Sequence, residues 1–222
     1  MIGEMRGAIF DLDGVIVDTA KYHYLAWRRL ATQLGFDFTP ADNERLKGVS
    51  RMRSLEILLE VGGRSFDPAT CRTLAARKNS WYVEYIRAMD AREILPGASE
   101  YIGLLRKAGV KTALASASKN APTILERLGI SGLFDAVVDG TQVTNSKPDP
   151  EAFLLAASAM GVPPRDCVVF EDAEAGVEAA RRAGMGIVGI GRPESLKDAD
   201  LVAASLGQLR ALLPWARCPV GR

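Results

Sequence analysis

Five short stretches of the chain are apolar almost throughout, and helical segments lie between the later ones. The stretches are residues 8–12, 111–116, 135–139, 167–172 and 186–191. They do not alternate apolar and polar positions, which is typical of strands in a parallel sheet that is covered on both faces. From about residue 95 onward, strand and helix alternate. This order predicts an α/β protein with a doubly wound, Rossmann-like parallel sheet.

Residues that commonly start or end helices support this pattern. Asp149 followed by Pro150 is typical of a helix start, and Gly161 is placed to end the same helix. Gly129 and Gly184 are placed to end the helices before the third and fifth predicted strands. The later part of the chain therefore divides cleanly into alternating strands and helices.

The segment between the first and second predicted strands is far longer than one crossover helix requires. It contains no convincing strand, and Thr39 and Asp67, each followed by a proline, are typical helix starts within it. The helical stretches are residues 18–35, 51–63 and 68–89. We therefore expect an inserted α-helical cap at residues 18–90, and a core formed by residues 1–17 and 91–222.

Composition and charge narrow the range of partners. Of the 222 residues, 48% are hydrophobic, and 28 basic residues stand against 27 acidic ones for a net charge of +1. No block of like charges stands out, so we expect neither nucleic-acid nor membrane-surface binding. Cys71, Cys167 and Cys218 form no CxxC or metal-binding spacing, and the N-terminus does not resemble a secretory leader. The sequence predicts a cytoplasmic protein with reduced thiols and a small-molecule partner.

Four of the five predicted strands end in polar residues. These are Asp11 and Asp13, Ser116, Asp139, and Glu171 with Asp172. In open α/β sheets, ligands bind outside the carboxyl ends of the strands, so these residues are expected to form one site. Four carboxylates gathered there would raise one another's pKa unless a cation were present, and Mg²⁺ prefers oxygen ligands of this kind. They are Asp11, Asp13, Glu171 and Asp172. The strand ends therefore predict a metal site.

Two further residues suggest that the same site binds a phosphoryl group. Lys147, in the loop before a predicted helix, adds positive charge, and Ser116 can donate a hydrogen bond to a phosphoryl oxygen. Taken alone, a DxD sequence is common in turns, and Glu171 with Asp172 can simply cap the next helix. The order of all these features along the chain favours function over an accident of structure.

The four motifs resemble those of the haloacid dehalogenase superfamily of phosphotransferases. They are DLDG at 11–14, ASAS at 115–118, SKPDP at 146–150 and EDAEAG at 171–176. The resemblance implies that Asp11 is the nucleophile, which forms an aspartyl phosphate, and that Asp13 is the general acid and base. Residues two apart on a strand leave it on the same side, which would bring both carboxylates to the substrate. An aspartate at position 13 fits chemistry on phosphate monoesters.

Within that superfamily, stretches in both lobes are similar to the β-phosphoglucomutase family. They are residues 18–27, 46–51, 77–83, 113–120 and 189–194. The resemblance implies interconversion of β-D-glucose 1-phosphate and glucose 6-phosphate, with Mg²⁺ as cofactor and β-glucose 1,6-bisphosphate as intermediate and activator. It also implies a monomer. Arg51 is expected to hold the phosphate that is not being transferred, and His23 to couple cap closure to Asp13.

The same resemblance implies further substrate-binding residues. They are Lys47, Gly48, Trp27, Ser118, Lys119, Asn120 and Lys78. For two of these residues a simpler interpretation stays open. Trp27 either lines the sugar site or packs within the cap, and Lys78 either binds substrate or is a solvated helix lysine.

Two alternative functions remain. A sugar-phosphate phosphatase of the same superfamily would use the same core residues with water as the final acceptor, and Arg51 and His23 argue against it. A receiver-like signalling domain also combines strand-end aspartates, a hydroxyl residue and a lysine on a doubly wound sheet. The cap insertion argues against that reading.

Overall fold

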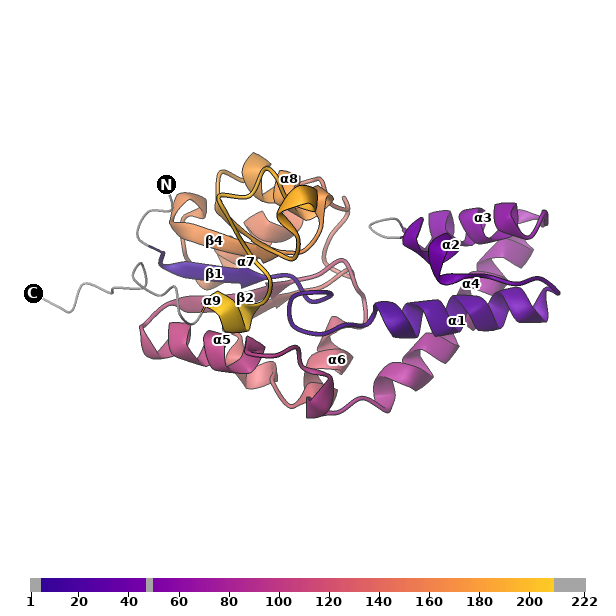
Figure 1. Cartoon of the computed structure of the whole chain (residues 1–222). Coiled ribbons are helices and arrows are strands. Elements are labelled where there is room, and N and C mark those ends of the chain that lie inside the picture. Colours follow the sequence, from indigo (N-terminus) through magenta and orange to yellow (C-terminus); the bar gives the residue numbers. More distant parts are fainter. Residues whose placement is uncertain (1–4, 47–49, 210–222) are drawn as a thin grey trace, which may run out of the picture. The chain divides into compact units, whose positions relative to one another are not determined.

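A computed structural model describes residues 5–46 and 50–209 of the chain (Figure 1). The chain divides into two compact units. The core unit combines the residues up to Asp18 with those from Asp90 onward, and the cap unit comprises Thr19–Met89. The boundaries expected from the sequence, 18 and 90, each differ from this division by one residue.

The core unit is built on a six-stranded parallel sheet with the strand order β3-β2-β1-β4-β5-β6. The strands are β1 (Gly7–Phe10), β2 (Lys111–Ala115), β3 (Ala136–Val138), β4 (Cys167–Glu171), β5 (Gly186–Ile190) and β6 (Leu201–Ala203). The predicted doubly wound α/β fold is confirmed. Strand β6, which has three residues and lies at one edge of the sheet, was not predicted from the sequence.

Helices cover both faces of the sheet. They are α5 (Ala98–Lys107), α6 (Ala121–Leu128), α7 (Glu151–Met160), α8 (Glu174–Arg182) and α9 (Leu206–Leu209), with 3₁₀ turns at Ala91–Glu93, Ser131–Leu133, Pro164–Asp166 and Pro193–Ser195. The helix predicted to begin at Pro150 begins one residue later, and the side chain of Asp149 accepts a hydrogen bond from the amide of Glu151 at 3.0 Å. Gly161 follows this helix with φ of 68°, as expected.

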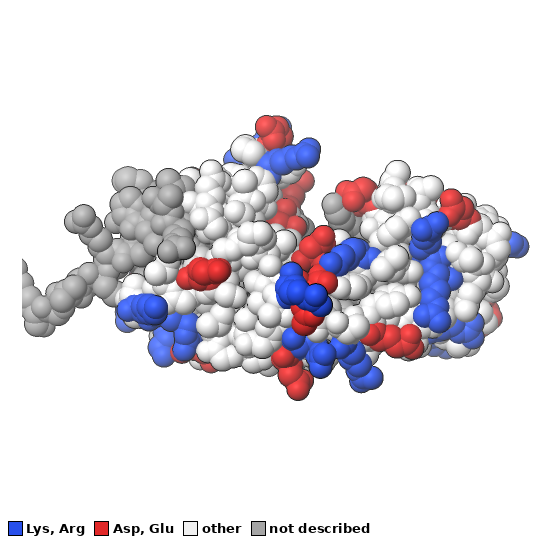
Figure 2. Space-filling view, turned by 60° about the horizontal axis from the view of Figure 1, so that its bottom comes forward, with Lys and Arg blue, Asp and Glu red and all other residues white. Residues whose placement is uncertain are grey.

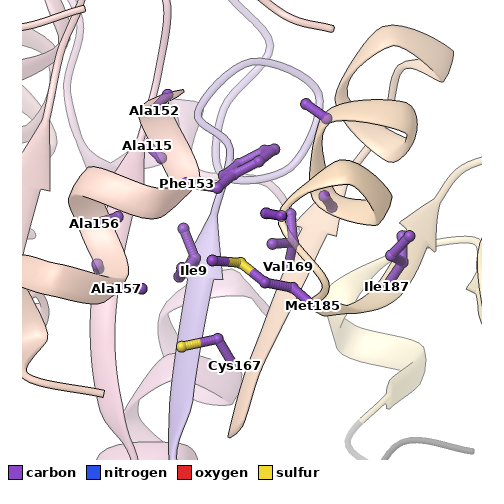
Figure 3. Close-up of a cluster of buried hydrophobic side chains, with 14 of the residues drawn as sticks. Ile9, Ala115, Ala152, Phe153, Ala156, Ala157, Cys167, Val169, Met185 and Ile187 are labelled. Atoms are coloured by element: carbon purple, nitrogen blue, oxygen red, sulfur yellow. The ribbon is translucent and has the colours of Figure 1, made fainter. Parts of the chain in front are cut away.

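One layer of the core lies between α7 and the central strands (Figure 3). Phe153, Ala156 and Ala157 of α7 pack with Ile9 of β1 and Val169 of β4, and all five are almost fully buried. The alanines keep the helix close to the sheet, and Phe153 fills the space near the carboxyl ends of the strands. This packing fixes the start of α7, and with it the end of the loop that carries Lys147.

The cap unit consists of α1 (Ala20–Gln33), α2 (Pro40–Glu44), α3 (Arg51–Val61) and α4 (Pro68–Arg87). The expected starts at Thr39 and Asp67 are real caps. Thr39 and Asp42 form a reciprocal capping box, and the Asp67 carboxylate accepts hydrogen bonds from the amides of Ala69 and Thr70. Helix α4 packs against both α1 and α3.

The core segments on either side of the cap insertion are joined to each other. Val17 and Ile94 form an antiparallel bridge, and the amide of Leu95 donates to the carbonyl of Ile16 at 2.9 Å. The chain therefore leaves the core and returns to it through one paired junction.

Charged side chains of both signs are dispersed over the surface. In the view of Figure 2, basic and acidic groups lie among larger areas of uncharged surface, in keeping with the near balance of 28 basic and 27 acidic residues. Within the described residues, no helix has the length and apolar character needed to cross a membrane.

Candidate active site

Asp11 directly follows the central strand β1, between β2 and β4. Its amide donates to the carbonyl of Phe170 at 2.9 Å, and the residue is only 7% exposed. The strand was expected to continue to Leu12, but it ends at Phe10. A tight turn follows, in which the amide of Val17 donates to the carbonyl of Leu12 at 3.1 Å. Asp11 and Asp13 therefore do not leave a strand on the same side, contrary to the expectation from the sequence. The turn after β1 sets the position of Asp13 instead.

Three carboxylates gather at this edge of the sheet. Asp11, Glu171 and Asp172 each offer an oxygen that lies within 4.8 Å of the others. Glu171 is the last residue of β4, which neighbours β1, so the sheet itself brings these groups together. A set of three carboxylates suits a hard divalent cation such as Mg²⁺. Asp13 was also predicted as a ligand, but it is not part of this set, so that role stays a prediction.

Lys147 joins two of these carboxylates. Its Nζ atom donates to Asp11 Oδ1 at 2.5 Å and to Glu171 Oε2 at 2.8 Å, and it lies 4.8 Å from the centre of the Phe153 ring. Burial by itself would lower the pKa of Lys147, but the charges of Asp11 and Glu171 outweigh burial and raise it. Lys147 therefore keeps its proton and remains a fixed positive charge beside Asp11.

Glu171 is buried, at 1% exposed, and burial raises its pKa to about 8 although Lys147 opposes the shift. A second positive charge at this position would favour the ionised carboxylate. Two glycines leave room for the acidic groups: a Cβ atom at Gly14 would lie 2.0 Å from Asp172 Oδ2, and one at Gly176 would lie 2.1 Å from Glu171 Cδ. The donor set and the space kept around it both fit a bound cation.

The loop after β2 carries the expected hydroxyl and amide groups. Ser116 is 1% exposed, and its Oγ accepts a hydrogen bond from the amide of Ser118 at 3.1 Å. The Ser118 Oγ in turn accepts from the amide of Asn120 at 3.2 Å. Because both hydroxyl oxygens act as acceptors, their hydrogens can point to a ligand. Lys119 is exposed, whereas Asn120 is half-buried just before α6.

A second polar cluster lies inside the cap unit. Lys78 of α4 is only 2% exposed, and its Nζ lies 2.8 Å from His23 Nδ1 of α1. The ammonium group also lies over two rings, 4.6 Å from the centre of Trp27 and 4.9 Å from that of Tyr82. Lys78 is therefore not the solvated helix lysine that the sequence left open, and Trp27, at 2% exposed, packs against it.

The surroundings of this cap cluster disfavour the protonated forms of Lys78 and His23. Burial, and then the charge of Arg51, lower the pKa of Lys78 to about 7. Burial likewise holds the pKa of His23 well below its usual value, with Lys78 and Arg51 adding to the effect. Arg51 is the first residue of α3, and within the described part of the cap no carboxylate is paired with Lys78. An anion bound beside these residues would favour the protonated, positively charged forms of Lys78 and His23.

Comparison with known proteins identifies the family. The model of haloacid dehalogenase-like hydrolases matches residues 5–184. This chain belongs to that family. It is 45% identical to the beta-phosphoglucomutase of Bacillus subtilis (strain 168) over 207 residues. The aligned region covers 92% of each protein. A crystal structure of beta-phosphoglucomutase from Clostridium difficile matches with a TM-score of 0.87 at 43% identity, over 96% of this chain and 97% of that one.

Phosphatases are also among the relatives of this haloacid dehalogenase-like protein. The fructose-1-phosphate phosphatase YqaB of Escherichia coli (strain K12) is 37% identical over 192 residues, covering 86% of this chain and 98% of that one. The resemblances drawn from the motifs, to the superfamily and to β-phosphoglucomutases, are confirmed. Both kinds of relative extend over the core and the cap.

The structure brings together part of the predicted residue set of this family member. Asp11, Lys147, Glu171 and Asp172 meet in the core, and His23, Lys78 and Trp27 meet in the cap. Lys47 and Gly48 lie outside the described residues. Sequence reasoning overlooked that Gly14 and Gly176 keep space for the carboxylates, although both stand inside the quoted motifs.

Proposed function

We propose that this protein interconverts β-D-glucose 1-phosphate and glucose 6-phosphate, as a β-phosphoglucomutase does, through an aspartyl phosphate and β-glucose 1,6-bisphosphate. The observation that carries the proposal is the contact of Asp11 with Lys147 beside Glu171 and Asp172, in a chain 45% identical to a beta-phosphoglucomutase. The bisphosphate would act both as intermediate and as activator.

In the proposed reaction, an oxygen of the Asp11 carboxylate attacks phosphorus, and the bond between phosphorus and the sugar oxygen breaks. Asp13 gives the proton that the departing oxygen takes up, and removes one from the sugar hydroxyl in the return step. Lys147 and Ser116 stabilise the charge on the oxygens of the group in transfer. Asp11, Glu171 and Asp172, with Asp13 as a further predicted ligand, would hold Mg²⁺, which would supply additional positive charge there.

The cap residues would bind the rest of the substrate. Arg51 at the start of α3 is proposed to hold the phosphate that is not being transferred, with Lys47 and Gly48 of the preceding loop. His23 and Lys78 form one hydrogen-bonded pair, in which His23 is proposed to couple cap closure to Asp13 and Lys78 to contact the substrate. The core loop residues Ser118, Lys119 and Asn120 are proposed to contact the sugar or its second phosphate.

The test is a coupled assay of glucose 6-phosphate formation from the β-anomer of glucose 1-phosphate. We expect a lag with this substrate alone that added glucose 1,6-bisphosphate shortens, because Asp11 must be phosphorylated before the cycle begins. Asp11→Asn should abolish turnover, since an amide cannot form the acyl phosphate. An Asp11→Asn enzyme with more than trace activity would remove this residue from the proposed role.

The phosphatase alternative is supported by the 37% identity to a fructose-1-phosphate phosphatase. It predicts free sugar and inorganic phosphate as main products and no dependence on the bisphosphate. Measuring both product sets in one reaction separates the two functions.

We further propose that the protein works in the cytoplasm as a monomer on a small sugar phosphate. The described cysteines, Cys71 and Cys167, are free thiols, which suits a reducing compartment. Light scattering coupled to size exclusion would test the monomer, and a mass of twice 23.9 kDa would contradict it.

A further inference from the structure

Lys147 reaches Asp11 from a loop with little regular structure. The loop joins β3 to α7, and its residues 144–146 are exposed. A long side chain on such a loop holds its ammonium group in place only if the backbone beneath it is held. The contacts that fix this backbone therefore bear on the position of a charge next to the nucleophile.

Glu151 makes the first of these contacts. One carboxylate oxygen accepts a hydrogen bond from the amide of Thr144 at 3.0 Å, and the other accepts from the amide of Asn145 at 2.7 Å. These two bonds lower the pKa of Glu151, so it is ionised at neutral pH. The side chain thus closes the loop from the first residue of α7 back to residues just ahead of Lys147.

Two contacts hold the other side of the loop. The Asp149 carboxylate accepts from the amide of Glu151, and Arg182 Nη1 donates to the carbonyl of Pro148 at 3.3 Å. Arg182 is itself bound to Glu178, one turn earlier on α8, at 2.9 Å. Lys147 therefore lies between two anchored points of the backbone.

We propose that Glu151 is a positioning residue, which acts through the loop to hold the Lys147 ammonium group against Asp11 and Glu171. An acidic residue in the first turn of a helix ordinarily stabilises that helix through its dipole. Glu151 differs, because both of its oxygens bond to loop amides six and seven residues earlier. This inference rests on the proposed function, in which Asp11 is the nucleophile.

The test measures phosphorylation of Asp11 by acetyl phosphate, in which the phosphoryl group passes to the aspartate and acetate leaves. Glu151→Ala in the full-length enzyme with Mg²⁺ should slow this single-turnover rate at saturating acetyl phosphate by about 10- to 100-fold, the range expected when a catalytic group is misplaced by about 1 Å. Mass spectrometry of the intact protein follows even slow rates.

Asp67→Ala is the matched control. Asp67 also accepts hydrogen bonds from two successive amides, and its pKa is likewise lowered, but it caps α4. Both variants should lose a similar amount of thermal stability, whereas only Glu151→Ala should lose rate. Equal rates in the two variants would overturn the inference. If Glu151→Ala fails to fold, Glu151→Gln serves instead, since it keeps one acceptor and should show an intermediate rate; an unchanged rate in that variant would equally overturn it.

A double mutant separates positioning from a direct effect. In a Lys147→Ala background, adding Glu151→Ala should change the rate by less than twofold, because the group that Glu151 positions is already gone. A further loss as large as in the wild type would show that Glu151 does not act through Lys147. Asp11→Asn shows whether a failed test concerns the proposed function or only the role of Glu151. If phosphorylation persists in Asp11→Asn, the proposed function is wrong. If Asp11→Asn is inactive and Glu151→Ala reacts at the normal rate, only the positioning role is wrong.

Discussion

The carboxylate of Glu171 occupies the space in which a side chain at Gly176 would lie. A Cβ atom on Gly176 would come within 2.1 Å of Glu171 Cδ and 2.3 Å of its Oε1. Gly176 belongs to α8, and it is buried against the end of β4. The helix can approach the Glu171 carboxylate this closely only because the residue has no side chain.

Gly176→Ala should therefore displace Glu171 and weaken Mg²⁺ binding. Disturbing the surroundings of a metal ligand typically lowers metal affinity by about 10- to 100-fold, and we expect a loss in that range. Titration calorimetry with Mg²⁺ measures it. Gly103→Ala in α5 is the control, because nothing lies within 4 Å of the new methyl group there, and its affinity should be unchanged. Wild-type affinity in Gly176→Ala would show that Glu171 can move without loss of the ion.

Asp13→Ala should preserve sugar-phosphate binding while slowing turnover. A lost general acid and base generally costs at least about 100-fold in rate, and we expect kcat to fall by that factor with KM little changed. Steady-state kinetics of glucose 6-phosphate formation supply both constants. A near-normal kcat would assign the proton transfer to another group.

Arg51→Ala should separate isomerisation from simple phosphoryl transfer. If Arg51 holds the idle phosphate, its loss should lower mutase turnover by about 30- to 1000-fold, the effect of removing a charge-assisted bidentate contact. Hydrolysis of acetyl phosphate, which has a single phosphate, should be nearly unaffected. An equal loss in both reactions would favour the phosphatase alternative, as would free sugar among the main products.

Lys78→Met should stabilise the protein, and more so at pH 7 than at pH 10. The pKa of Lys78 is about 7 in the folded protein against an ordinary 10.5, so between these values the unfolded chain binds one more proton and stability of the wild type rises with pH. Methionine does not titrate, so the substitution removes this pH-dependent contribution to the free energy of unfolding. The gain in the free energy of unfolding should therefore be larger at pH 7 than at pH 10 by about 3 kcal/mol.

Urea unfolding of the wild type and of Lys78→Met at pH 7 and pH 10 measures that difference. Effects of pH on other groups are common to the two proteins and cancel in the comparison. A gain that is the same at pH 7 and pH 10 would mean that Lys78 keeps an ordinary pKa in the folded cap. Lys78→Met should at the same time lose catalytic activity, because the partner of His23 is gone.

The sequence predicts those features that depend on local pattern. The five predicted strands lie in apolar runs, and Thr39 and Asp67 accept hydrogen bonds from amides within the first turns of their own helices, so both features can be recognised without tertiary information. The burial of Lys78 cannot be predicted in this way, since a lysine at a helical position is ordinarily solvated. The packing of α1 against α4 brings Trp27 and His23 to Lys78, beside Tyr82 of its own helix.

The candidate site was predictable in its members but not in its geometry. Asp11 follows β1 and Glu171 ends β4, and these strands are neighbours in the sheet, so the approach of the two residues follows from topology. The position of Asp13 does not, because β1 stops at Phe10 and a turn takes over. The bonds of Glu151 to the loop amides are equally hidden, since first-turn acids usually serve their own helix.

Because Val17 and Ile94 pair with each other, the two ends of the cap insertion are held together within the core unit. Since the two ends of the insertion are already paired within the core, a linker of a few residues can replace Thr19–Met89 without opening the sheet. A cap taken from another relative could be joined at the same two positions, and the core would keep Asp11, Lys147 and Glu171. The two units can therefore be varied separately, by exchange of one continuous segment of the gene.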